Sequence, residues 1–362
     1  MSPWQAAGLY DPDAPDADER ARGLEYLASL GLSVEDVSLA ATEGRLDRLA
    51  ADHLLWHDVG ATLDIHDITE RTGLDIELVR AIARASGTPE ALDESIYRVP
   101  HVELFSSFAL GAQIFGEEAV LQFTRVIGSA AARVAEAAVS LFAANVSPRL
   151  RERDDALETV RQSAEAVRAF AVVPNAMDIL LREHFLTAIR RAGLFDIVEG
   201  GATPVTIGFV DLVESTAAVH AVTPEQWSNA VAAFETTALE AAVEHDCRVV
   251  KLIGDEVMLA GATAAQITTV AARVLDTAER DARLGSARAG VASGYAVARD
   301  GDYFGMTVNL AARLVKVAEP GDILVNDEAS SALAEAGRPV ESMGEYAIKG
   351  FGTAVPTFRV TR

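Results

Sequence analysis

The stretch CRVVKLIGDEVMLAG (residues 247–261) contains two short apolar runs joined by Gly254, Asp255 and Glu256. Apolar runs of this length around a glycine-containing turn are typical of a β-hairpin. Upstream, VTIGFVDL (205–212) is apolar and β-branched enough to be another, buried strand. The segments that lie between and after these strands then decide the fold.

Helices are predicted on both sides of the hairpin. Thr223, Pro224 and Gln226 supply an N-cap, a proline at the first helical position and a capping-box glutamine, so a helix is expected from there to about His245. The remaining expected elements are, in order, a helix at 264–283, a strand at 287–299, a helix at 307–318 and a strand from 323. The order β-α-β-β-α-β is that of a ferredoxin-like, or palm, α+β sheet.

The N-terminal half has a helical periodicity instead. Apolar residues recur every three to four positions through residues 21–198, which predicts an all-α domain that ends in a linker helix. Glycines and a proline at 199–204 mark a composition shift, so a second domain is expected at 203–362. Residues 1–20 are acidic and rich in proline, which predicts a disordered lead-in.

Composition limits the possible partners and the compartment. A net charge of −23 disfavours binding to nucleic acid or anionic lipid, because both attract basic side chains. Cys247 is the single cysteine, so no internal disulfide can form, which fits a reducing cytoplasm. The acidic N-terminus does not resemble a signal peptide, and no stretch of about 20 residues lacks charge. We therefore expect a cytoplasmic protein without a membrane span.

Two aspartates stand at the ends of the predicted strands. Asp211 ends the first strand and Asp255 lies in the hairpin turn, so the two carboxylates meet if these strands are neighbours. Such a pair suits two Mg²⁺ or Mn²⁺ ions over a triphosphate, because hard cations take oxygen ligands. The alternative is that each aspartate has only an ordinary role in a turn.

Three further polar residues stand out, one in a strand and two on a helix. The chain has three lysines against 28 arginines, and Lys251 lies inside an otherwise apolar strand, where a lysine needs a partner or a cleft. Asn309 and Arg313 are four residues apart and share a helix face, which suits a sugar oxygen and a phosphate. An exposed strand face and a solvated helix face are the alternatives.

The motifs that carry these residues resemble the class III adenylyl cyclases, in the order and spacing of that family. The motifs are FVDLVEST (209–216), VVKLIGDEVM (249–258), DYFGMTVNLAARL (302–314) and IKGFG (348–352). The resemblance implies that Asp211 and Asp255 bind two divalent cations, with the Leu212 backbone carbonyl as an additional candidate ligand. It further implies that Lys251 and Asp302 select the base and that Asn309 and Arg313 stabilise the transition state. Lys349 matches the family's triphosphate-binding lysine.

Base choice and assembly follow from the same resemblance. Adenine presents an acceptor at N1 and a donor at its amino group, which a Lys251 donor and an Asp302 acceptor complement. Guanylyl cyclases of the family typically have Glu and Cys there, so ATP is the expected substrate. A diguanylate cyclase is disfavoured because the hairpin reads Gly-Asp-Glu-Val. Family sites form across a dimer interface, so a homodimer with two equivalent sites is expected.

One motif departs from the family pattern. Glu214, Ser215 and Thr216 replace the Gly-Phe-Thr that usually follows the metal-binding turn. The change places a carboxylate close to the expected triphosphate, so altered metal demand or lower activity is expected.

The N-terminal half resembles the regulatory domain of soluble actinobacterial cyclases, in which such a domain controls activity in response to pH. Histidines, which titrate near neutrality, make a pH switch physically available. Five lie in this half, namely His53, His57, His66, His101 and His184. His184 precedes the catalytic domain most closely and is the regulatory candidate, although a structural or surface role is the alternative for each.

A rival hypothesis starts from residues 64–86, which have the pattern of a helix-turn-helix around Gly73. The protein would then be a transcription regulator with a catalytically weak, nucleotide-binding cyclase relic. The segment has more acidic than basic side chains, whereas duplex binding requires the opposite balance. A helical hairpin used for packing is the preferred interpretation.

Overall fold

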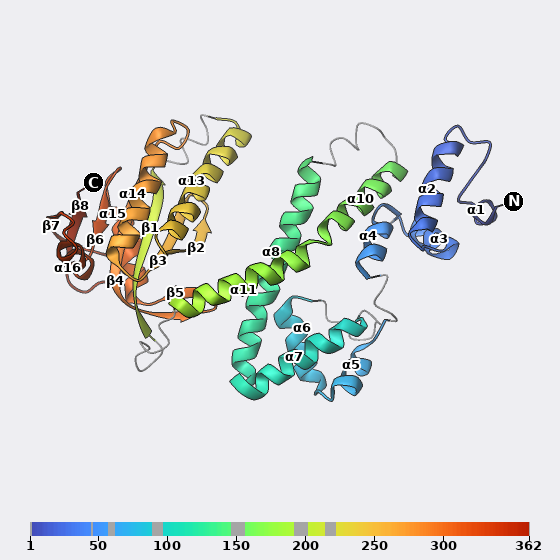
Figure 1. The fold of residues 1–362 in the computed structure, drawn as a ribbon, viewed down its shortest axis with the longest axis horizontal. Helices are drawn as coiled ribbons and strands as arrows, with labels where there is room; N and C mark the ends of the chain where they lie inside the picture. Colours follow the sequence, from blue (N-terminus) through green and yellow to red (C-terminus); the bar gives the residue numbers. More distant parts are fainter. Residues whose placement is uncertain are drawn as a thin grey trace. The chain divides into compact units, whose positions relative to one another are not determined.

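The computed structural model describes residues 2–44, 46–56, 62–88, 97–145, 156–191, 202–213 and 222–361. The chain divides into two compact units, Met1–His184 and Phe185–Arg362 (Figure 1). Each unit is described by itself below.

The first unit is helical. Its helices are α1 (Pro3–Ala6), α2 (Ala17–Ser29), α3 (Val34–Thr42), α4 (Leu46–Trp56), α5 (Ile65–Thr72), α6 (Ile76–Ser86), α7 (Val99–Phe115), α8 (Glu117–Asn145), α10 (Ala156–Phe170) and α11 (Val173–Arg191). One apolar cluster joins α2, α3, α4 and α10, and a second joins α5, α6 and α7. Helix α11 contains the point at which the two units divide.

The N-terminal segment differs from the predicted disordered lead-in. Helix α1 begins with a capping box, and Leu9 is only 6% exposed within the first apolar cluster. The Arg20 side chain donates a hydrogen bond from Nε to the Leu9 carbonyl, at 2.6 Å. Composition misled here, because Trp4 and Leu9 find apolar partners that are distant in sequence.

The segment at 64–86 does form helix, turn and helix. Helix α5 ends at Thr72 and is capped by Gly73, whose φ of 69° is left-handed, and α6 follows. Val79 and Ile82 of α6 are fully buried in the second apolar cluster. The pair of helices is thus part of the packing of this unit, as the preferred interpretation expects.

Helix α8 qualifies the expectation about membranes. By length and composition it could cross a membrane, and none of its apolar window is buried against the described residues. The expectation relied on a complete lack of charge, whereas α8 combines scattered charges with a high mean hydropathy. One such helix is weak evidence of a span, because packing helices of soluble proteins reach the same composition.

The second unit is built on one sheet. Its elements are β1 (Ala202–Val213), α13 (Pro224–Glu244), β2 (Arg248–Ile253), β3 (Glu256–Gly261), α14 (Ala264–Arg280), β4 (Ser286–Arg299), β5 (Asp302–Phe304), α15 (Met306–Val317), β6 (Ile323–Val325), α16 (Asp327–Glu335), β7 (Val340–Tyr346) and β8 (Val355–Val360). The strand order is β2-β3-β1-β4-β6-β8-β7, with β5 paired to β4. The predicted β-α-β-β-α-β order is confirmed.

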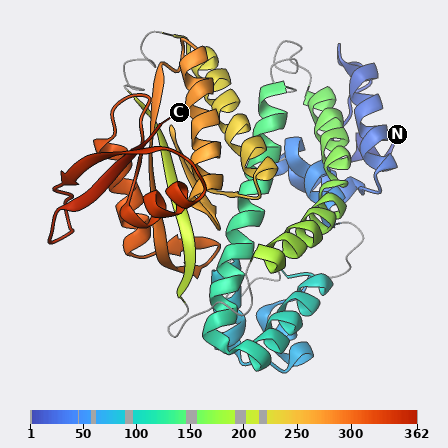
Figure 2. The ribbon, with the colours of Figure 1, turned by 60° about the vertical axis from the view of Figure 1, so that its left-hand side comes forward.

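Strand β1 lies inside the sheet, between β3 and β4, and its side chains alternate between two apolar cores. Val210 and Leu212 pack with residues of α13 and α14, whereas Ile207 and Phe209 pack with residues of α15. Figure 2 shows the sheet with helices against its faces. Successive side chains of a strand point to opposite faces, so Asp211, two residues after Phe209, is on the same face as α15. Gly290 lets α15 approach β4 closely, since a Cβ there would lie 2.1 Å from a backbone nitrogen of α15.

Candidate active site

The two aspartates expected to bind metal come together at one end of the sheet. Strands β1 and β3 are antiparallel neighbours, with Asp211 opposite Glu256. The Leu212 amide donates a hydrogen bond to the Asp255 carbonyl, at 3.2 Å, which ties the hairpin turn to the end of β1. Asp211 is 6% exposed, whereas Asp255 is half-buried. The strand pairing on which the prediction depended is therefore present.

Cationic side chains surround the Asp211 carboxylate. Arg288 of β4 lies directly opposite Asp211 in the register and donates to Oδ2 from Nη2, at 3.1 Å. The Lys316 ammonium of α15 is 3.1 Å from the same oxygen and 3.8 Å from the Glu256 carboxylate. Sequence reasoning missed these three residues as members of the site. Their signals were slight: Lys316 is one of the rare lysines, and Glu256 follows the turn aspartate.

The pKa of the Glu256 carboxyl is affected by burial and by the charged groups around Asp211. Burial is the largest cause that raises the pKa of its carboxyl above the usual value. The nearby charges of Asp211 and Asp255 raise that pKa further, whereas Lys316 and Arg288 lower it. Two further carboxylates and two cations thus lie close enough to act on the Glu256 carboxyl.

This donor set fits hard divalent cations that share their coordination with a substrate. Among the described residues, no group of three His, Cys, Asp or Glu side chains is placed to hold a metal ion. Mg²⁺ commonly uses one or two carboxylates and completes its shell with water and phosphate oxygens. The Asp211 and Asp255 pair meets that requirement, with the Leu212 carbonyl beside it in sequence.

Lys251 and Asp302 form a hydrogen-bonded ion pair. Lys251 lies on β2 and Asp302 begins β5, and Lys251 Nζ donates to Asp302 Oδ2. Their side chains are 42% and 25% exposed, so a ligand can reach them. The other oxygen, Oδ1, accepts from the Tyr303 amide at 2.8 Å, which orients the carboxylate. The structure therefore brings together two residues that are 51 positions apart.

Asn309 and Arg313 lie one turn apart on the exposed face of α15. The helix begins after Gly305 and is anchored by Thr307, whose hydroxyl donates to the Tyr295 carbonyl at 2.7 Å. The opposite face is buried against the sheet, so the amide and the guanidinium are presented to solvent. They are available to a phosphate or a sugar.

Lys349 is the expected site residue that lies apart from the others. It is exposed after β7, beside Ile348, which is 4% exposed and anchors the segment in an apolar cluster. Within the described residues, no ion pair joins Lys349 to the rest of the site. Glu214, Ser215 and Thr216 lie outside the described residues.

The histidines of the helical unit occupy different environments. His53 Nε2 is 2.8 Å from the Leu30 carbonyl. His101 Nδ1 accepts a hydrogen bond from the Arg98 amide at 3.0 Å, and burial lowers the pKa of its imidazole. His66 and His184 are exposed on α5 and α11. His57 lies outside the described residues.

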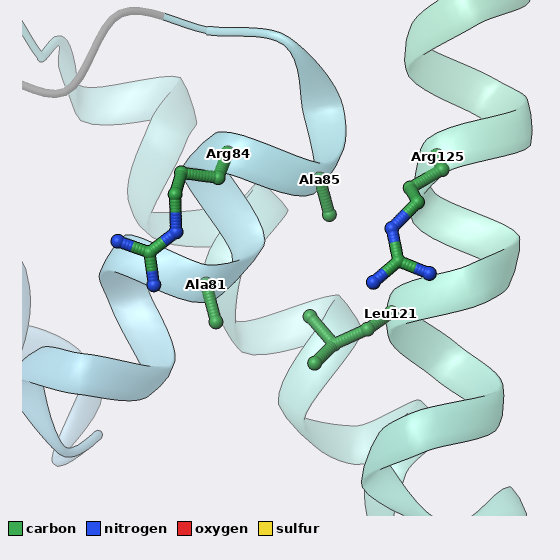
Figure 3. A pocket seen from close by; sticks show the side chains of 5 residues that line it. All are labelled: Ala81, Arg84, Ala85, Leu121 and Arg125. Atoms are coloured by element: carbon green, nitrogen blue, oxygen red, sulfur yellow. The ribbon is translucent and has the colours of Figure 1, made fainter.

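A pocket of about 360 Å³ in the helical unit is lined by residues of α6 and α8. Figure 3 shows Arg84 on one wall and Arg125 on the other, with Leu121 and two alanines of α6 between them. It lies in a different unit from the carboxylates and the Lys251–Asp302 pair.

Two family models match successive parts of the chain. Residues 198–361 match the adenylate and guanylate cyclase catalytic domain. Residues 5–185 match the adenylate cyclase regulatory domain.

Three curated relatives each match over 80% of this chain or more. An uncharacterized protein of Mycobacterium tuberculosis is 31% identical, over 98% of this chain and 93% of the relative. A pH-sensitive adenylate cyclase of the same species is 30% identical, over 95% of this chain and 88% of the relative. An adenylate cyclase of Glutamicibacter nicotianae is 27% identical, over 80% of this chain and 76% of the relative.

Two solved structures match less than half of this chain. The adenylyl cyclase CyaB from P. aeruginosa is 22% identical with a TM-score of 0.40, over 46% of this chain and 97% of that chain. A guanylate cyclase domain from Catenaria anguillulae in complex with GTP is 19% identical with a TM-score of 0.40, over 44% of this chain and 96% of that chain.

Proposed function

The chain belongs to the class III adenylyl cyclase family, with an adenylate cyclase regulatory domain ahead of its catalytic domain, and we propose that it converts ATP to 3′,5′-cyclic AMP and pyrophosphate. The ion pair between Lys251 and Asp302 is the observation that carries this choice of substrate. An ammonium group can donate to N1 of adenine, and a carboxylate can accept from its 6-amino group. Guanine has the reversed pattern, so the ammonium would face the N1–H donor and the carboxylate would face the O6 acceptor.

The reaction joins the ribose 3′ oxygen to the α-phosphorus and breaks the bond from that phosphorus to the bridging oxygen of pyrophosphate. The proton of the 3′ hydroxyl is released to solution. Asn309 is suited to hold the ribose, and Arg313 is suited to the charge that builds on the α-phosphoryl oxygens. Both side chains are exposed on one face of α15, which supports these roles. Lys349 would bind the triphosphate.

Asp211 and Asp255 would hold the two divalent cations, Mg²⁺ or Mn²⁺, with the Leu212 carbonyl as an additional ligand. When bound, such ions neutralise phosphate charge and increase the acidity of a coordinated hydroxyl. The protein's own contribution at this end is to place Asp211 and Asp255 on adjacent backbone segments.

The active form is proposed to be a homodimer. Large apolar side chains are exposed around the Asp302 hairpin and the start of α15: Tyr295 is 59%, Phe304 50% and Met306 57% exposed. Apolar groups gathered beside a site are typical of a surface that a second chain covers. Each chain contains both carboxylates and the base-selecting pair, so two equivalent sites would form.

The helical domain is proposed to regulate the cyclase, with pH as the candidate signal and His184 as a candidate responder. A relative that matches over both domains is named a pH-sensitive adenylate cyclase. The protein is proposed to act in the cytoplasm.

The test is production of cyclic nucleotide by the full chain from ATP and from GTP, with Mn²⁺, at pH 5.5 and 8. Cyclic AMP from ATP in clear excess over cyclic GMP, at a rate that differs between the two pH values, would support the proposal. A chain that dimerises and binds ATP but forms no product would instead favour the relic hypothesis, in which the domain only binds nucleotide.

A further inference from the structure

A β-bulge in β2 is the starting point. Val249 pairs with Leu259 and Lys251 pairs with the next residue of β3, Met258, so Val250 is an extra residue. In a regular strand, residues three apart point to opposite faces. The extra residue restores the parity, so Arg248 and Lys251 can point to the same side.

Both side chains indeed reach the same hairpin, the one that joins β4 to β5. Lys251 binds the carboxylate of Asp302. Arg248 Nη2 donates to the carbonyl of Gly301, and its guanidinium carbon lies 5.4 Å from the centroid of the Tyr303 ring. The distance to the ring is that of a cation–π contact. Arg248 therefore contacts the residue before Asp302 and the residue after it.

The turn of this hairpin has backbone angles that a contact from Arg248 can help to hold. Arg299 and Asp302 are paired across a two-residue turn, and the turn residues Asp300 and Gly301 have φ values of 55° and 76°. A two-residue turn with both residues in the left-handed region is favoured in short hairpins. Asp adopts that conformation less readily than glycine does. A contact at Gly301 fixes the turn at the residue that immediately precedes the base-selecting carboxylate.

We propose that Arg248 is a positioning residue for base selection: by holding Gly301 and Tyr303, it keeps Asp302 in place as the acceptor beside Lys251. The inference rests on the proposed function, since it assigns a role in the choice between ATP and GTP. The planar guanidinium can donate to a carbonyl and cover a ring at once, which a lysine ammonium cannot reproduce.

The chain offers a matched control in the same hairpin. Arg299 Nε lies 3.2 Å from the carboxylate of Asp300, and the pair is exposed. Arg299→Gln thus removes a cation from the same turn and leaves the contacts of Arg248 intact. Arg248→Gln removes both contacts. Arg248→Lys keeps the positive charge but loses the planar guanidinium.

The experiment measures kcat/KM for ATP and for GTP with the full chain and these three variants, together with their thermal midpoints. For Arg248→Gln, the ATP-to-GTP ratio of kcat/KM is expected to fall about tenfold, because a hydrogen-bonded contact beside the acceptor is lost. The ratio for Arg248→Lys is expected to lie between those of Arg248→Gln and the unsubstituted chain. Arg299→Gln is expected to keep the original ratio.

Two outcomes would overturn the inference. One is a parallel fall for ATP and GTP in Arg248→Gln, with an unchanged ratio, which is the signature of a merely structural role. The other is an equal change of the ratio in Arg299→Gln. Equilibrium binding of ATP and GTP to the same variants gives a readout without turnover. A chain that prefers ATP in binding but makes no cyclic AMP would contradict the proposed function alone, and the effect of Arg248→Gln on that preference would still decide the role of Arg248.

Discussion

The ammonium nitrogen of Lys316 lies 3.1 Å from a carboxylate oxygen of Asp211. The Asp211 side chain is 8% exposed, so its charge is held away from water and is compensated by Lys316 and Arg288. The protein thus provides its own cations where a metal ligand is proposed. Any divalent ion that binds Asp211 must share the carboxylate with these groups or displace one of them.

Removing the Lys316 charge should favour metal binding over the metal-free state. Lys316→Met is expected to lower metal-free stability by about 1 kcal/mol, since the exposed ammonium contributes modestly. It should also reduce the Mn²⁺ concentration needed for half-saturation, because one competitor for Asp211 is gone. Thermal unfolding in chelator and Mn²⁺ binding followed by electron paramagnetic resonance check both effects. Lys316→Arg is the control, and weaker Mn²⁺ binding by Lys316→Met would contradict the prediction.

Each of the two carboxylates proposed to bind metal should be essential for turnover. Asp211→Asn and Asp255→Asn keep the side-chain size but remove the charge, and each is expected to lower cyclic AMP production at least about 100-fold. Product formation at increasing Mn²⁺ is the measurement. Asp276→Asn changes a carboxylate on α14, outside the site, and serves as the comparison. Activity within a few-fold of the unsubstituted chain in Asp211→Asn would rule out its role as a metal ligand.

Reversing the hydrogen-bonding pattern of the Lys251–Asp302 pair should reverse the proposed preference for ATP over GTP. In a Lys251→Glu, Asp302→Cys double variant, an acceptor replaces the donor and the carboxylate is removed, so kcat/KM for ATP is expected to fall about 100-fold. The ratio of cyclic GMP to cyclic AMP formed from equal ATP and GTP should rise. An unchanged ratio, with both products reduced together, would mean that the pair does not read the base.

Acid should destabilise the helical domain through His101. Its pKa is lowered, chiefly by burial, so the folded state binds its proton less readily than the unfolded state does. Stability is therefore expected to decrease as pH falls below the unfolded pKa of about 6.5, until the folded imidazole is protonated too. Thermal midpoints of the full chain from pH 5 to 7.5 test this.

His101→Gln should flatten that pH dependence, because a glutamine can accept the Arg98 amide hydrogen bond without titrating. His66→Gln replaces an exposed histidine of the same domain and should leave the slope as it is. Equal slopes in the unsubstituted chain and in His101→Gln would show that His101 does not contribute.

Local sequence determined most of the catalytic fold. The apolar and β-branched run before Asp211, the capping box at Thr223 and the glycine turn before Asp255 act within a few residues of themselves, so they can be read without the rest of the chain. The order of the elements follows from them. The candidate site residues could be picked out because each motif places a polar or charged side chain near the end of a strand, in a turn or near the start of a helix.

Tertiary structure alone decided which distant groups meet. The N-terminal segment folds because Leu9 finds a core. Lys316 reaches Asp211 because α15 packs close to the sheet at Gly290. Arg248 and Lys251 reach one hairpin because of the extra residue at Val250. Packing distance and strand register arise from contacts between segments far apart in the chain, so no local pattern records them.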